Sequence, residues 1–365
     1  MTTSHHVNIV SASWETNMSK KVSIIVPIYN AERFLASTLD SLVNQSLHDI
    51  DIICINDGST DRSLEICEDY QVKYSDLIRI FSKPNGGIAD ARNYGLSKVI
   101  GEYIGFLDSD DTAEINMFET LYNKAISEQA DVVFSDFYWS YPDQENIVKD
   151  GPYTNNKEIL TSMFATLWNK LYRTDFINSL NIDFPTGYRY EDASFLYKIT
   201  PFIKKWSYVS EPFVHYRQTT GSITHNHNER VKDMIHVFED LLEFYKQRSV
   251  YVEYERELEY LFVRFFLGNS FLRTCQIKDK NDRKLTLDLS FKILTSNFPK
   301  WKGNPYLKGS GLKNKYYRTV NNFTYPIYSS IFSILYRFKK ETLHWLVSLT
   351  RLWYNPGLLD DFPNH

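Results

Sequence analysis

The chain has 365 residues, 43% of them hydrophobic, so it is long enough for two domains with a substantial core. It carries 41 basic and 45 acidic side chains, a formal net charge of −4, and this balance gives no electrostatic case for nucleic acid, because binding to the phosphate backbone requires a basic face. Neither an apolar run of about 18 residues nor the apolar core of a signal peptide occurs, so neither a membrane span nor secretion is predicted. Three scattered cysteines favour a reducing, cytoplasmic location over a disulfide framework or a zinc site.

The first half of the chain alternates apolar runs of strand length with segments of helical periodicity. Residues 1–20 are polar and lack such periodicity, so we expect a disordered leader there. Strands are then expected at residues 22–26, 51–56, 78–81, 103–107 and 131–137, and helices at 34–42, 62–74, 89–97 and 118–126. This alternation predicts an α/β fold with a doubly wound, mostly parallel sheet, in which ligands bind outside the carboxyl ends of the strands.

The second half reads as mainly helical. Residues 138–160 are polar and irregular, and residues 167–176 are expected to begin a helix-rich segment. An amphipathic helix starts near Val231, which places a domain boundary near residue 228, between a catalytic domain (21–228) and a helical region (229–365). Within that region, residues 276–322 are basic and polar and predict a poor core. Residues 331–353 carry aliphatic and aromatic side chains interspersed with Arg and Lys.

Three acids end the apolar run of residues 101–107: Asp108, Asp110 and Asp111. Carboxylates packed this closely repel one another, and a divalent cation among them relieves the repulsion and can offer charge to a phosphate. The alternative is an acidic turn that caps the helix starting near Glu114. An EF-hand calcium loop fails at Ala113, where its tight turn requires glycine.

Further polar loops follow the other expected strands. Asp57 can accept a hydrogen bond from a base N–H while Gly58 lets the ligand approach closely, although Asp-Gly pairs are also common in simple turns. The loop Lys83–Gly87 is neither a P-loop nor a dinucleotide fingerprint, and it predicts a tight bend. Arg92, which follows it, is either a surface ion-pair partner or a donor to phosphate in the pocket.

A second group of candidates lies beyond the first five strands. Asp192 is either an acid at a helix start, favoured by the helix dipole, or the general base that removes a proton from an attacking hydroxyl. Arg217 and Ser222 suit a diphosphate. His215 is a candidate metal ligand, although a lone histidine is more often structural.

Together these segments resemble the inverting glycosyltransferases of family 2, which have the GT-A fold. The resemblance covers about residues 20–228 and keeps the family's order of motifs. It rests on VSIIVPIYN (22–30), INDGSTD (55–61), KPNGGIADARNYGL (83–96), GEYIGFLDSDD (101–111), WNKLYR (168–173), RYED (189–192) and YRQTTGSIT (216–224).

The resemblance implies a role for each candidate residue. Asp192 is implied as the catalytic base, and Asp108 and Asp110 as the DxD pair that contacts ribose and a Mn²⁺ or Mg²⁺ ion, with His215 as a further candidate metal ligand. The residues implied to bind the nucleotide sugar are Pro27, Tyr29, Asn30, Asp57, Asn85, Arg92, Asp108, Asp110, Asp111, Arg217 and Ser222, with Asp57 on uracil. One departure is Asn56, where the family often has Asp.

The function that these features predict is a metal-dependent transfer of one hexosyl or N-acetylhexosaminyl group. The donor is expected to be a UDP-sugar and the acceptor a hydroxyl of a cell-surface or lipid-linked glycan. The QxxRW motif of processive synthases is absent, which favours single-sugar transfer. Two alternatives stay open, a nucleotidyltransferase and a non-catalytic module that binds nucleotides or glycans. The C-terminal helices either pack on the catalytic domain or contact the inner face of an anionic membrane, and a homo-oligomer is left open.

Overall fold

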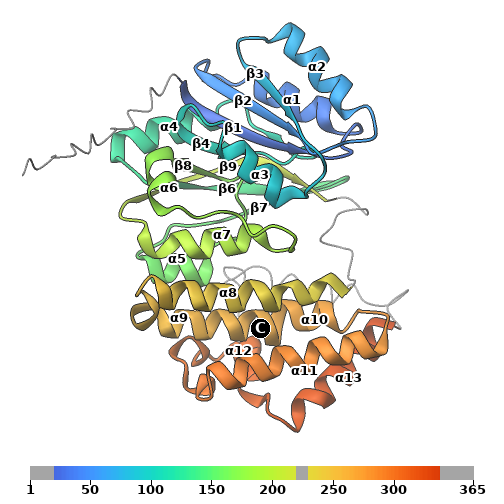
Figure 1. Ribbon diagram of the computed structural model, residues 1–365. Helices are drawn as coiled ribbons and strands as arrows, with labels where there is room; N and C mark the ends of the chain where they lie inside the picture. The colour runs from blue at the N-terminus through green and yellow to red at the C-terminus, as the bar shows by residue number, and fades with distance from the viewer. Residues whose placement is uncertain (1–19, 219–228, 338–365) are drawn as a thin grey trace, which may run out of the picture.

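The structure is a computed structural model that describes residues 20–218 and 229–337. An α/β region built around one sheet lies at one end of the molecule, and a stack of helices lies at the other (Figure 1). The expected leader, apart from Lys20, lies outside the described residues, as do Ser222 and the end of the chain from residue 338. None of the helices in the described ranges is long and apolar enough to cross a membrane.

The described residues form one mixed sheet of nine strands in the order β3-β2-β1-β4-β8-β6-β9-β5, with β7 added to β6. Strands β1 to β4 run parallel, β8 is antiparallel to both β4 and β6, and β6 is parallel to β9. The strands are β1 (Lys20–Ile28), β2 (Ile50–Asn56), β3 (Ile78–Ser82), β4 (Gly101–Phe106), β5 (Thr112–Ala113), β6 (Val132–Tyr141), β7 (Gln144–Val148), β8 (Lys170–Arg173) and β9 (Trp206–Arg217).

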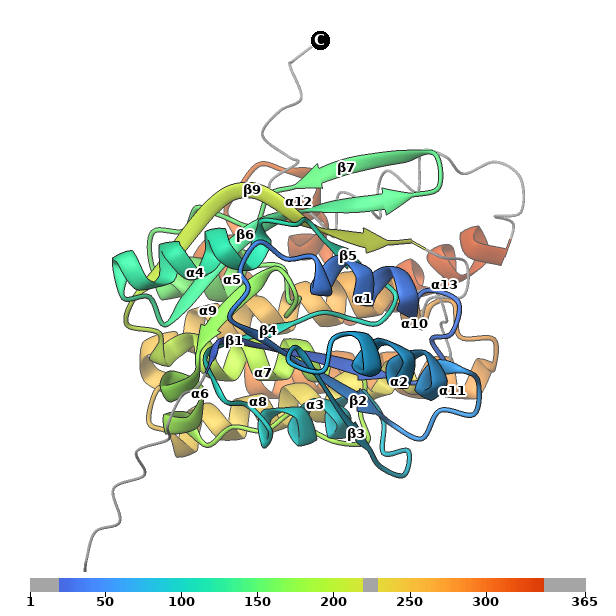
Figure 2. The same ribbon diagram turned by 90° about the horizontal axis from the view of Figure 1, so that it is seen from above.

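Helices cover both faces of this sheet, which explains why β1 and β2 are apolar without alternation. On one face Val22, Ile24 and Val26 pack with α1, α2 and α4; on the other, Ile25 packs with α3, α6 and α7 (Figure 2). The helices of this region are α1 (Leu35–Val43), α2 (Ser63–Lys73), α3 (Ile88–Leu96), α4 (Met117–Glu128), α5 (Asn156–Ser162), α6 (Thr174–Leu180) and α7 (Glu191–Ile199). The predicted α/β fold class is confirmed.

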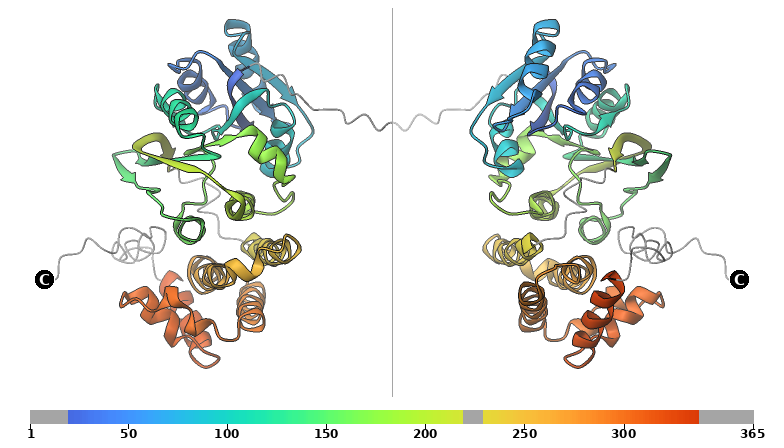
Figure 3. Two further views of the ribbon diagram at one scale, coloured as in Figure 1. Left: turned by 90° about the vertical axis from the view of Figure 1, so that its left-hand side faces the viewer. Right: turned by 90° about the vertical axis from the view of Figure 1, so that its right-hand side faces the viewer.

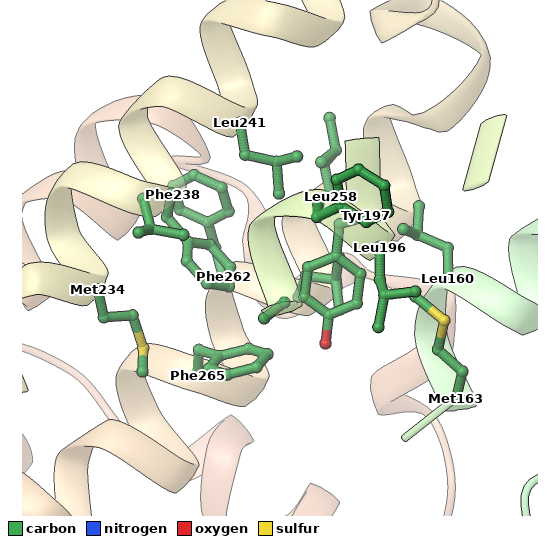
Figure 4. Packing of buried hydrophobic residues seen from close by; sticks show 14 of the residues in the cluster. Leu160, Met163, Leu196, Tyr197, Met234, Phe238, Leu241, Leu258, Phe262 and Phe265 are labelled. Carbon is green, nitrogen blue, oxygen red and sulfur yellow. The ribbon is translucent and has the colours of Figure 1, made fainter. Parts of the chain in front are cut away.

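The helices after residue 228 share a core with the underside of the sheet. One buried cluster runs from Ile25 of β1 to Tyr325 near the end of the described chain. In Figure 4, Leu196 and Tyr197 of α7 lie in the same packed group as Phe238 and Phe262 of the later helices. These helices are α8 (Asp233–Gln247), α9 (Tyr251–Arg264), α10 (Ser270–Thr274), α11 (Lys280–Asn297), α12 (Leu312–Thr319) and α13 (Thr324–Arg337).

Two predictions about the middle of the chain are wrong in part. Residues 138–160 are not irregular throughout, because they complete β6, turn into β7 and then form α5. Residues 167–176 do not begin with a helix but contain β8. Its Lys170 is fully buried and donates to Asp150 (2.7 Å), so the predicted helix-rich segment begins with a strand that carries a buried ion pair.

The prediction of a poor core in residues 276–322 is also wrong. That segment contains α11 and α12, and it buries Leu294, Trp301, Leu307 and Tyr317. Most of its lysines lie on the outside, so composition alone hides the apolar residues that pack inward.

Candidate active site

The loops that carry the predicted site residues meet at one edge of the sheet. Parallel pairing puts Ile28 beside Asn56 and Ile25 beside Phe106, so β1, β2 and β4 end at similar heights. The segments that follow these strands therefore project from the same edge, as expected for a doubly wound sheet.

Asp57 holds the loop that follows β3. One carboxylate oxygen accepts from the Lys83 ammonium (2.6 Å) and the Gly86 N–H (2.9 Å), and the other accepts from the Gly87 N–H (2.8 Å). Asn85 donates to the Asp57 carbonyl oxygen (3.0 Å). The structure thus gives Asp57 a positioning role, and contact with uracil stays a prediction. Lys83 was not among the candidate site residues, although a cation just after the strand beside β2 was an available signal.

The residues after β1 join the same loop cluster. Pro27 is buried in β1, whereas the Tyr29 ring is 53% exposed at the strand end. Asn30 has a positive φ of 50°; its side-chain oxygen accepts from the Thr60 N–H (2.8 Å), and its own N–H donates to Ser59 (3.1 Å). An exposed tyrosine on a fixed turn is free to stack on a flat ring.

Arg92 links the end of β4 to the start of α7. Its guanidinium is buried and donates to Asp108 (2.8 Å) and to Glu191 (2.7 Å). Burial alone would lower the pKa of Arg92, but Asp108, Glu191 and Asp192 raise it overall, so the group stays charged. Arg92 is therefore an ion-pair partner, but a buried one rather than one at the surface, and its contact with phosphate stays a prediction. Glu191 was not among the candidates, although it adjoins Asp192.

Asp192 lies in the first turn of α7, two residues after Tyr190, whose backbone is left-handed with a φ of 69°. Its carboxylate accepts from the Ala193 N–H (2.7 Å). Burial, followed by the charge of Glu191, raises the pKa of Asp192 to about 7. A carboxylate with that pKa can accept a proton near neutral pH, which is the property that a general base needs.

The acids after β4 differ in their surroundings. Burial, followed by Asp108, raises the pKa of Asp110 to about 6. Asp111 is fully buried: one oxygen accepts from the Arg217 N–H (2.8 Å) and the other has no hydrogen-bond partner. Burial, followed by Asp110 and Asp108, raises the pKa of Asp111 well above its usual value. Asp111 therefore anchors the end of β9, and Thr38 of α1 donates to its carbonyl oxygen (2.7 Å).

Asp108 and Asp110 fit a partial metal-ligand set. Among the described residues, no group of three or more His, Cys, Asp or Glu side chains is placed to hold an ion. Mg²⁺ in phosphate-transfer sites is usually held by one or two carboxylates together with substrate phosphates, so a full protein cage is not required. The mutual repulsion that raises the pKa of Asp110 is the kind that a cation relieves.

His215 does not join this pair. It lies beside Thr112 across the β5–β9 pairing, but its two ring nitrogens contact Glu145 (2.8 Å) and Glu114 (2.9 Å). The ring also stacks on Tyr138, so the geometry gives His215 a structural role and leaves no ring nitrogen for a metal. Arg217 lies over the Phe34 ring with its guanidinium 4.6 Å from the centroid, at the edge of the same loop cluster.

The sheet order and the strand-end loops define a protein of the GT-A fold. A family model described as "Glycosyl transferase family 2" matches residues 23–189. The chain is 34% identical over 273 residues to cholesterol galactosyltransferase of Borreliella burgdorferi, a match that covers 69% of this chain and 75% of that protein. The chain belongs to glycosyl transferase family 2.

Two further proteins are similar to this chain, one in sequence and one in fold. It is 36% identical over 218 residues to the uncharacterized glycosyltransferase EpsJ of Bacillus subtilis, and it spans only 62% of the length of that relative. The crystal structure of TarS residues 1–349 of S. aureus has a TM-score of 0.64 at 20% identity, and the match covers 88% of this chain and 93% of that one. At 20% identity this structural similarity shows the fold alone. Its coverage of 88% of the chain means that the similarity includes part of the C-terminal helices.

Substitution of Gly58 tests whether its close approach to the loop after β3 requires glycine, and substitution of Gly187 is the control. Gly58 and Gly187 both have positive φ, +72° and +83°, but a Cβ would lie 2.8 Å from the Asn85 nitrogen at Gly58 and within 4 Å of nothing at Gly187. We expect Gly187→Ala to lower the free energy of unfolding by about 1–2 kcal/mol and Gly58→Ala by about 1–3 kcal/mol more. Urea unfolding measures both, and equal losses would contradict the predicted clash.

Proposed function

We propose that this protein transfers one sugar from a UDP-sugar to a hydroxyl group of a cell-surface or lipid-linked glycan, with inversion at the anomeric carbon. Membership of the family supports sugar transfer. The observation that carries the proposal is the position of Arg92, which holds Asp108 from the end of β4 beside the α7 turn that bears Asp192. One buried guanidinium thus bonds the acid expected at the diphosphate and Glu191, the residue next to the base candidate.

The proposed reaction is a single displacement. Asp192 accepts the proton of the acceptor hydroxyl, and the oxygen attacks the anomeric carbon. The bond from that carbon to the diphosphate oxygen breaks, and UDP leaves with the electron pair. Tyr29 and the loop fixed by Asp57 would hold the nucleotide base. Asp108 and Asp110 would hold Mn²⁺ or Mg²⁺, which supplies positive charge to the leaving diphosphate.

The proposal that the donor is a UDP-sugar is supported by what two similar proteins are described to bind or transfer. A second TarS crystal structure, described as a complex with UDP-GlcNAc, matches this fold with a TM-score of 0.51. The name of the Borreliella relative includes galactosyl transfer. A hexosyl or N-acetylhexosaminyl donor is therefore the first group to screen, and a bacterial cytoplasm, where nucleotide sugars are made, is the proposed location.

The base assignment predicts a specific loss of turnover. Asp192→Asn keeps the size of the side chain but cannot accept the proton, so we expect kcat to fall by about 10²–10⁴-fold while UDP binding is retained. Asp183→Asn, at an exposed acid on the neighbouring loop, is the control and should keep wild-type turnover. UDP release across a panel of donors and acceptors measures both.

Three outcomes of that assay would overturn the proposal. Undiminished turnover in Asp192→Asn would remove Asp192 from the base role. Release of pyrophosphate in place of UDP would indicate nucleotidyl transfer. Saturable UDP binding by the wild-type protein without turnover on any donor would indicate a binding module.

The raised pKa of Asp192 predicts the pH dependence. Below pH 7 the carboxyl is mostly protonated and cannot act as a base, so log kcat/KM should rise with a slope of about 1 up to roughly pH 7 and then level off. The residual activity of Asp192→Asn should lack this limb. A profile that is flat between about pH 5 and pH 8 in the wild-type enzyme would contradict the assignment.

The metal assignment is tested by binding rather than by turnover. We expect UDP to bind on the order of tenfold more tightly with Mn²⁺ than with EDTA, since a cation held by Asp108 and Asp110 would offset the negative charge of the diphosphate. Asp110→Asn should remove most of this difference, whereas Asp143→Asn, at an exposed turn far from β4 in sequence, should preserve it. Calorimetry shows the outcome, and equal affinity with and without cation would refute a metal-bridged donor.

A further inference from the structure

The charge of the chain is unevenly distributed. Residues 289–337 contain eight Lys or Arg and no Asp or Glu, although the whole chain has a net charge of −4. Six of these cations have exposed side chains: Lys292, Lys300, Lys302, Lys308, Lys315 and Arg318. Burial, followed by a smaller effect of Arg264, lowers the pKa of Lys313 to about 7, so that lysine adds little charge.

The same segment exposes large apolar side chains. On α13, Ile327, Ile331 and Ile334 are 56%, 46% and 53% exposed, and their spacing of four and three residues puts them on one face of the helix. The opposite face is packed, because Tyr325 stacks on Phe291 (4.4 Å). Within the described part of the chain, helix α13 is thus apolar on two sides and covered on one.

The basic and apolar residues lie at the same end of the molecule. Tyr316 of α12 packs on Tyr328 of α13 (5.1 Å between ring centroids), so the two helices are neighbours. Phe323, which joins them and is 84% exposed, lines a shallow pocket of about 400 Å³ with Trp301 and Lys302. Figures 1 and 3 show these elements at the end opposite β1–β3.

We propose that this surface docks the protein onto an anionic lipid bilayer. We call it the basic apolar face, and its residues are Lys300, Lys302, Lys308, Leu312, Lys315, Phe323, Ile327, Ile331 and Ile334. Exposed isoleucine and phenylalanine enter the headgroup boundary while lysines beside them meet lipid phosphates, the combination by which monotopic helices bind. This inference does not rest on sugar transfer.

A lipid surface fits this face better than a protein partner does. A protein partner normally presents charges of both signs, whereas residues 289–337 offer cations alone, which matches a sheet of uniform negative charge. The sequence beyond the described residues again combines basic and aromatic side chains in Phe338, Lys339, Lys340, Trp345 and Trp353, and it also contains Glu341. Exposed apolar groups of this extent mark an interaction site rather than a solvated surface.

Vesicle flotation of the full chain tests the proposal. We expect binding to phosphatidylglycerol–phosphatidylcholine vesicles, little binding to phosphatidylcholine alone, and weakening as salt is raised. Lys315→Glu with Ile331→Glu should weaken binding by roughly tenfold or more. Val72→Glu with Lys73→Glu is the matched control, because it makes the same charge change on α2, where Val72 is 84% exposed. UDP release with a soluble acceptor should be unchanged in both variants.

A second variant and a second measurement exclude trivial explanations. Lys300→Glu with Lys308→Glu changes two exposed charges, and it should also lose flotation while its thermal unfolding midpoint is kept. Failure of the intact chain to float, or equal flotation of the α13 variant and its control, would overturn the proposal. So would a lowered unfolding midpoint or a dissociated oligomer in the α13 variant, since either shows that the chain itself or a second copy covers the face.

Discussion

The buried guanidinium of Arg92 is the constraint on which the site depends. A charged group removed from water is stable only while its partners remain, and loss of one partner of such a pair typically costs about 3–5 kcal/mol. Its partners come from different elements, Asp108 from the end of β4 and Glu191 from the start of α7, and they lie 16 and 99 residues away in sequence. The ion pairs therefore fix the distance between the acid expected at the diphosphate and the acid expected at the acceptor.

The helical region after residue 228 helps to hold the turn that precedes Asp192. Asp233, in the first turn of α8, accepts from the Arg189 N–H (3.1 Å) and from the Arg230 side chain (3.1 Å), and Arg230 also donates to the Gly187 carbonyl oxygen (3.1 Å). These bonds hold the turn directly before Asp192. With the core shared between α7 and the later helices, they make the position of the base a property of both regions.

The parts of the site that sequence predicted are those fixed by strand order. Asp57 and Asp108 end parallel strands, and parallel strands bring their carboxyl ends to one edge without further information. His215 could not be placed in this way, because its partners Glu145 and Glu114 depend on the register of β9 against β5 and β6. Strand β8 was missed because an antiparallel strand of four residues within LWNKLYR leaves too short a pattern to distinguish from a helix.

The position of the basic apolar face sets a condition on the acceptor. Figures 1 and 3 show α7 below the sheet, followed toward that end of the molecule by a layer with α8 and α9 and then by α11 to α13. Packed helices are about 8–10 Å apart, so two layers hold Asp192 roughly 20 Å from a bilayer that contacts the outer one. A hydroxyl at the headgroup level would not reach the base in that orientation. A docked enzyme of this shape therefore suits an acceptor that already carries a glycan long enough to span the helical region, and it disfavours transfer of a first sugar directly onto lipid.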